Sequence, residues 1–133
     1  MTKLLKNNKG FTLVEVIVVA VIVLILAAVA IPLYNGYIND SRYAMAEGSA
    51  GSIAGALTVA MQLEVDPTFA AGPDNNTTVT IPSARAGGDD TVIQTPKDFT
   101  VSNADPVTDG YVVVDGPNNV SACKEFVQGA TCP

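Results

Sequence analysis

A long apolar run near the N-terminus constrains the fold of this chain more than any other feature. Residues 11–31 contain only two polar side chains, Thr12 and Glu15. At about 1.5 Å per residue, a helix of this length reaches roughly 30 Å, which matches the hydrocarbon core of a bilayer. Three of the seven basic residues precede the run within the first ten positions. The positive-inside rule keeps them in the cytoplasm and places the rest of the chain outside.

The run differs from an ordinary secretory signal. It is longer than a usual h-region, and it ends in Ala-Ile-Pro with no clear A-x-A processing site. We therefore expect the helix to stay on the mature protein. A simple uncleaved anchor is the plainest interpretation, but it leaves Glu15 unexplained.

Glu15 needs a cationic partner if the run enters a membrane. An ionised carboxylate costs roughly 2.5–3.5 kcal/mol at the centre of a membrane helix and less near its end. No Lys, Arg or His lies in residues 11–31. A cut just before Phe11 would create a positive α-amino group, and Glu15 could pair with that amine in its own chain or in a neighbouring subunit. The second arrangement would select the register between packed helices, as buried polar groups do in coiled coils.

The junction Gly-Phe-Thr-Leu-Val-Glu at residues 10–15 resembles the processing motif of type IV pilins and type II secretion pseudopilins. The lysine-rich leader and the apolar run up to Pro32 are similar too, so the resemblance covers about residues 1–43. It implies that a prepilin peptidase cuts between Gly10 and Phe11 and methylates the new Phe11 amine. It also implies that Glu15 pairs with the Phe11 amine of an adjacent copy during assembly on an inner-membrane platform.

Pro32 is the expected site of a helix break. Proline removes one helix hydrogen bond and kinks or ends the helix near the preceding turn. In filaments of the resembled family, a segment before this proline loses its helical form. Leu24 stands here where those helices often carry glycine, which makes such melting harder.

The rest of the chain predicts an α+β fold. The helix should resume after Pro32 and continue to about residue 63. A stripe at i, i+4 spacing is its predicted core face: Met45, Ser49, Ile53, Leu57 and Met61. Three or four short antiparallel strands should form one small sheet against this helix, at Thr77–Ile81, Thr91–Gln94, 99–102 and 111–115.

This pattern divides the chain into four segments. We expect a leader at 1–10 that is removed, a membrane or filament-core helix at 11–32, an amphipathic continuation at 33–65, and a β-rich head at 66–133.

The only two cysteines, Cys123 and Cys132, lie close to the C-terminus. Export would favour a disulfide between them, whereas a cytosolic location would leave two free thiols. The chain contains no histidine, so the pair makes a poor zinc site. The resemblance to pilins places a disulfide-closed surface loop at this position of the head.

Composition excludes several classes of function. The net charge of −6 would repel nucleic acid phosphates. The absence of histidine removes the commonest general base, and no nucleotide-binding fingerprint occurs. We predict no catalytic residue, cofactor or metal site, and hence no enzyme. A calcium site at Asp89-Asp90 or at Asp105…Asp109 is the less favoured alternative to solvated turns.

The sequence thus predicts a structural subunit of an extracellular type IV pilus. Its expected partners are the prepilin peptidase, the membrane before assembly, the assembly platform and copies of itself in a helical filament. It would reside in the inner membrane as a precursor and then in the pilus. A periplasmic type II secretion pseudopilin or a minor pilin is the close alternative. A membrane-anchored binding domain that never polymerises is the remote one.

Overall fold

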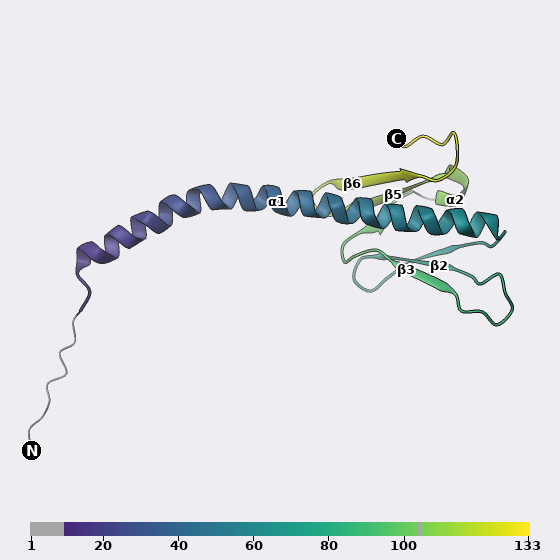
Figure 1. Ribbon diagram of the computed structural model, residues 1–133, viewed down its shortest axis with the longest axis horizontal. Coiled ribbons are helices and arrows are strands. Elements are labelled where there is room, and N and C mark those ends of the chain that lie inside the picture. The colour runs from purple at the N-terminus through teal and green to yellow at the C-terminus, as the bar shows by residue number, and fades with distance from the viewer. Residues whose placement is uncertain (1–9, 104) are drawn as a thin grey trace, which may run out of the picture. The chain divides into compact units, whose positions relative to one another are not determined.

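The computed structural model describes residues 10–103 and 105–133. Figure 1 shows one long helix followed by short strands. In chain order the elements are α1 (Leu13–Gln62), β1 (Thr68–Ala71), β2 (Thr77–Ile81), β3 (Thr91–Gln94), β4 (Thr100–Val101), α2 (Pro106–Asp109), β5 (Tyr111–Gly116) and β6 (Val120–Glu125). The chain divides into two compact units after Tyr37, and we call the second unit, Ile38–Pro133, the head. The predicted α+β class is confirmed.

The helix α1 runs through Pro32 without interruption. The single chain therefore shows no break at Pro32, and a kink or a loss of helix in the assembled filament stays a prediction. A proline inside a helix removes one backbone hydrogen bond. The helical residues on both sides keep their own hydrogen bonds, so the loss of one bond does not end the helix here.

Small residues form most of the core face of α1 within the head. The buried residues of the helix are Ala46, Ala50, Ile53, Ala54, Leu57 and Ala60. Ile53 and Leu57 were predicted correctly, but Met45 and Met61 are 49% and 44% exposed, so that part of the predicted face is wrong. Alanine lets the helix backbone approach the strands closely, whereas the prediction followed the larger apolar side chains.

The strands form two antiparallel sheets rather than the single sheet expected. Their orders are β1-β2-β3 and β4-β5-β6. The strands predicted at Thr77–Ile81 and Thr91–Gln94 are confirmed with the same bounds. Strands β1 and β6 were not predicted, because the sequences Thr-Phe-Ala-Ala and Val-Ser-Ala-Cys-Lys-Glu contain few of the β-branched and aromatic residues that signal a strand. The inner residues of both sheets join the α1 face in one core.

Two buried threonines, Thr77 and Thr95, join the two sheets, and we call this pair the threonine seam. The Thr95 hydroxyl accepts a hydrogen bond from the backbone N–H of Thr77 at 2.8 Å and donates to the carbonyl of Phe99. The Thr77 hydroxyl accepts from the N–H of Val101 in β4 at 2.9 Å. The seam therefore connects the first residue of β2 to β4 of the second sheet through two buried hydroxyl groups.

The predicted disulfide between Cys123 and Cys132 is confirmed, with 6.0 Å between the two Cα atoms. Cys123 lies in β6, and the chain then turns back past Gly110. The carbonyl of Gly110 accepts the N–H groups of Phe126 and Val127 at 3.0 and 3.1 Å. These bonds hold the disulfide loop against the end of α2.

Replacement of Thr95 by valine tests the threonine seam. Thr95→Val keeps the shape of the side chain but leaves the Thr77 N–H and the Phe99 carbonyl without their partner. We expect the free energy of unfolding to fall by about 1–3 kcal/mol, the usual cost of a buried unsatisfied polar group. Urea unfolding of the full chain in detergent, followed by circular dichroism, measures this. Thr80→Val is the matched control, because the Thr80 hydroxyl forms no hydrogen bond with the described residues. An equal effect of both substitutions would contradict the seam.

Candidate assembly segment

Thr12 starts α1 and positions Glu15. The Thr12 hydroxyl accepts a hydrogen bond from the backbone N–H of Glu15 at 3.3 Å, and the Thr12 carbonyl accepts from Val16 at 3.3 Å. A threonine followed three residues later by glutamate is the sequence of a capping box. Sequence analysis missed the role of Thr12, although this spacing was the signal for it. The cap places the Glu15 carboxylate in the first turn, where the positive end of the helix dipole favours it.

Phe11 and Glu15 lie on the same shallow hollow at the start of α1. The hollow is lined by Phe11, Glu15, Val16 and Val19. Phe11 is 83% exposed, and an added Cβ at Gly10 would meet no described atom within 4 Å. Gly10 and Phe11 are thus both exposed among the described residues. Pro32 lies within α1, and the two cysteines belong to the head.

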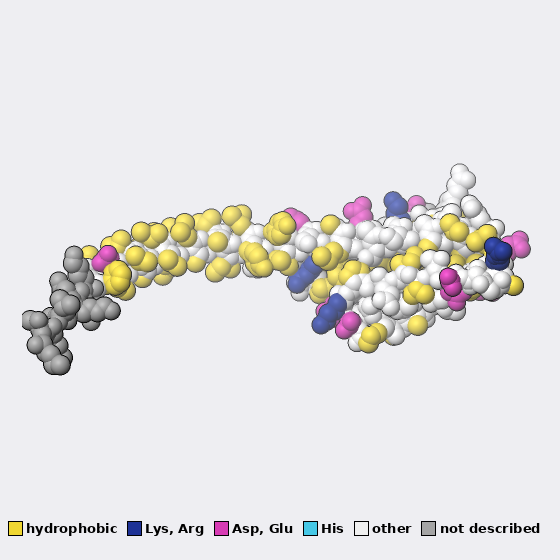
Figure 2. All heavy atoms as spheres, turned by 60° about the horizontal axis from the view of Figure 1, so that its bottom comes forward, with side chains coloured by type: hydrophobic (Ala, Val, Ile, Leu, Met, Phe, Trp, Pro, Cys, Tyr) yellow, Lys and Arg dark blue, Asp and Glu magenta, His cyan; other side chains and the backbone are white. Residues whose placement is uncertain are grey.

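The large apolar side chains of residues 16–31, the apolar segment of α1, are all exposed. Each large apolar side chain in it is 51–70% exposed. Figure 2 shows this surface as a nearly continuous cover of hydrophobic side chains over the N-terminal part of the helix. An 18-residue window of α1 has a mean hydropathy of 3.3 and none of it is buried, so by length and composition it could cross a membrane. Exposed apolar surface of this extent marks a contact with lipid or protein.

Three of the carboxylates considered for calcium form local hydrogen bonds. Asp90 accepts the N–H of Ser83 at 3.1 Å. Asp105 caps α2 by accepting the N–H of Thr108 at 3.3 Å and also the Thr108 hydroxyl. Asp109 accepts from the Asn103 amide at 3.2 Å. Within residues 10–103 and 105–133, no three acidic, cysteine or histidine side chains gather as a possible metal site.

The cap at Asp105 makes a pH-dependent contribution to stability. Hydrogen bonds from the side chain and the backbone of Thr108 lower the pKa of Asp105 from its ordinary value of 3.8. A carboxyl group whose pKa is lowered by folding stabilises the protein above its unfolded pKa and loses this effect as the pH falls through the folded pKa.

We therefore expect Asp105→Ala to be less stable than the unchanged chain at pH 7, and the difference to shrink below pH 3.8. Unfolding by urea at a series of pH values measures this. Asp66→Ala, which removes an exposed carboxylate without a hydrogen bond to the described residues, is the control. A difference that stays constant down to pH 2 would contradict this account of the cap.

The N-terminal part of the chain is similar to known fimbrial proteins. Residues 5–31 match the family model described as the prokaryotic N-terminal methylation motif. The Type IV major fimbrial protein FimA of Dichelobacter nodosus is 46% identical over 70 residues, which cover 53% of this chain and 41% of the relative. The fimbrial protein EcpC of Eikenella corrodens is 44% identical over 51 residues, which cover 38% of this chain and 33% of the relative.

These similarities confirm the resemblance of the N-terminal segment to type IV pilins. The aligned part spans less than half the length of these curated relatives. No solved structure matches the chain.

Proposed function

We propose that this chain is the structural subunit of an extracellular type IV pilus and that it polymerises through the apolar segment of α1. The exposed surface of residues 16–31, placed just after the Gly10-Phe11 junction, carries the proposal. Water is a poor environment for this surface, so it must be covered by lipid or by other copies of the chain. The similarity to the FimA proteins of Dichelobacter nodosus supports contact with other copies of the chain.

The proposed maturation begins at the exposed junction. A prepilin peptidase would hydrolyse the bond between Gly10 and Phe11, release residues 1–10 and methylate the new amine of Phe11. The methylated amine keeps its positive charge. It therefore provides the cation that Glu15 needs in an apolar environment.

Glu15 would pair with the Phe11 amine of an adjacent copy. A charge that is buried without a partner is strongly unfavourable, whereas a paired one is tolerated. The Thr12 cap fixes the Glu15 backbone one turn from Phe11, so the carboxylate has a defined position on the helix. Copies in the wrong register would leave both charges unpaired, and the pair would thereby select one register.

The head would lie outside the cell on the filament surface. Its disulfide suits an oxidising environment. The subunit would be a membrane protein before assembly and would need the assembly platform to leave the bilayer. The proposal gives the chain a structural role and assigns it no catalytic step.

Intact mass of the filament fraction tests this function. Filaments sheared from the cells should contain an abundant form of the chain that lacks residues 1–10, is one methyl group heavier and is two hydrogen atoms lighter because of the disulfide. A processed form found only in the membrane fraction would favour the pseudopilin or the minor pilin. An uncleaved chain would overturn the proposal and favour the membrane anchor.

Replacement of Glu15 tests the charge pair. We expect Glu15→Val to insert and to be cleaved normally but to give at least about 100-fold less filament, because loss of one partner of a buried pair costs about 3–5 kcal/mol. Immunoblots of the sheared and membrane fractions measure both forms. Asp66→Val removes an exposed carboxylate of the head and serves as the control, which should assemble fully. Normal assembly of Glu15→Val would exclude the pairing role.

A further inference from the structure

Strand β3 (Thr91–Gln94) has one side without a strand partner. Among the described strands its neighbour is β2, and β3 stands at the end of the order β1-β2-β3. The N–H of Thr95 donates to the carbonyl of Thr77 at 3.0 Å, so the backbone of Thr95 faces β2. The bonding direction of the backbone alternates along an antiparallel strand, and the N–H and C=O groups of Val92 and Gln94 therefore point away from β2. We call these four groups the β3 edge.

The β3 edge lacks the features that normally keep sheet edges apart. Edge strands in natural proteins usually carry charged side chains, a proline or a bulge. The sequence of β3 is Thr-Val-Ile-Gln, and all four residues pair with β2 in an unbroken register. By contrast, β6 at an edge of the second sheet carries Lys124 and Glu125, and β4 at its other edge has only two residues.

Val92 distinguishes β3 from the other uncharged edge strand, β1. Val92 is 56% exposed, and among the described residues after Leu63 it is the one large apolar side chain that is exposed. The exposed side chains of β1 are the small or polar Thr68, Ala70 and Ala71. A single exposed valine is ordinary on a protein surface. Here it belongs to an uncharged strand whose backbone is unpaired, and the three features together indicate a contact surface.

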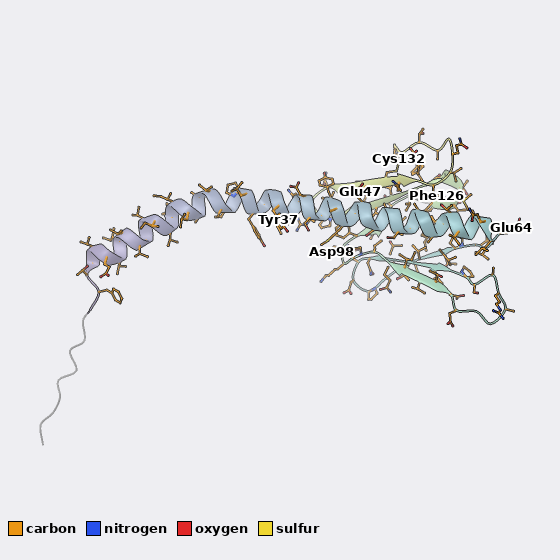
Figure 3. The ribbon with its side chains drawn as sticks, viewed as in Figure 1. Tyr37, Glu47, Glu64, Asp98, Phe126 and Cys132 are labelled. Atoms are coloured by element: carbon orange, nitrogen blue, oxygen red, sulfur yellow. A yellow bond between two sulfur atoms is a disulfide. The ribbon has the colours of Figure 1, made fainter. Side chains whose placement is uncertain are left out.

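The charges on either side of β3 indicate that the partner is a second β3. Asp89 and Asp90 come directly before the strand, and Lys97 lies three residues after it. In an antiparallel pair, the start of each strand lies beside the end of the other, so the acidic pair of each copy approaches Lys97 of the other copy. Asp98, labelled in Figure 3, follows Lys97, but its N–H donates to the carbonyl of Asp74 at 3.1 Å and its positive φ turns the chain.

We propose that the β3 edges of two copies pair antiparallel and thereby join two filaments side by side. This inference rests on the proposed function and adds a contact between filaments to it. In the register that we assign, Val92 of each copy lies opposite Gln94 of the other, and the two Ile93 residues face each other at the two-fold axis. Each Val92–Gln94 pair exchanges two backbone hydrogen bonds. The same register places Lys97 opposite Asp89 of the second copy.

The symmetry of this contact excludes it from the inside of a single filament. Copies in one helical filament are related by rotation and translation along one axis, so each contact between them joins two different surfaces. The β3 contact is isologous, because it joins the same surface of both copies. Its second copy must therefore belong to another filament, and the β3 edge must lie on the filament surface.

The short length of β3 makes the contact depend on repetition. Four residues from each copy bury far less than the roughly 1,200–2,000 Å² of a stable interface, so dispersed subunits should stay apart. Two filaments that lie side by side repeat the contact along their length. The repeated contacts then hold the filaments together by avidity.

A lysine at Val92 tests the contact, with pairing measured separately from filament yield. Low-speed centrifugation of sheared filaments pellets bundles and leaves single filaments in the supernatant. Val92→Lys places like charges near each other across the contact, and we expect an about tenfold smaller share of filament in the pellet at an unchanged total yield. Ala70→Lys places the same charge at the opposite edge of the same sheet and should bundle like the unchanged chain.

A charge exchange tests the register. Lys97→Glu and Asp89→Lys should each reduce the share of filament in the pellet, because each places like charges opposite one another. The double variant restores opposite charges in reversed order, so it should restore bundling. A photo-crosslinking residue at Val92 should also give an adduct between two copies, with the second attachment within residues 90–96.

Three results would overturn the inference and leave the pilus subunit intact. The first is undiminished bundling of Val92→Lys filaments, the second is an equal loss with Ala70→Lys, and the third is single filaments from the unchanged chain. A failure of the unchanged chain to form any filament would overturn the proposed function and the inference with it.

Discussion

The apolar surface of residues 16–31 cannot remain in water, and the other features of the N-terminal half follow from this constraint. Removal of apolar surface from water contributes roughly 25 cal/mol per Å². A segment with this surface is stable in lipid or against other helices. Each polar group that enters such surroundings needs a hydrogen-bond partner or an opposite charge. The Thr12 hydroxyl satisfies the N–H of Glu15, one of the free N–H groups in the first turn of α1, and this turn places Glu15 at the favourable end of the helix dipole. The carboxylate charge of Glu15 requires a partner from outside the helix.

Within the head, the same helix meets a different requirement. Its core face is built of alanines with two larger residues, Ile53 and Leu57, which lets the strands approach the backbone. The two sheets do not form a continuous ladder, and the threonine seam connects them where the strands stop pairing. A hydroxyl group can replace a strand partner for an isolated N–H or carbonyl group. The threonine seam thus pairs buried backbone groups that have no partner in a neighbouring strand.

The N-terminal half was largely predictable because its signals are local. The apolar run, the Gly10-Phe11 junction and Glu15 are adjacent in sequence, and the length of the run fixes the kind of element. The head was less predictable, since β6 consists of weak strand formers that are held in place by β5 and the disulfide. The core face of α1 was missed in part because alanine gives little hydrophobic signal. Pro32 predicted a break that the single chain does not show. The cost of one lost hydrogen bond is smaller than the stabilisation from the helical hydrogen bonds on both sides.

The disulfide has a consequence for the chain end. Strand β6 lies at the edge of its sheet, and an edge strand is the first to detach when its free end is pulled or digested. Here the chain after β6 returns to Cys123 through Cys132, and Gly110 holds the returning segment. Residues 123–132 therefore form a covalently closed ring. A pull on the chain at Cys132 therefore passes through the disulfide directly to Cys123 within β6 and bypasses residues 124–131.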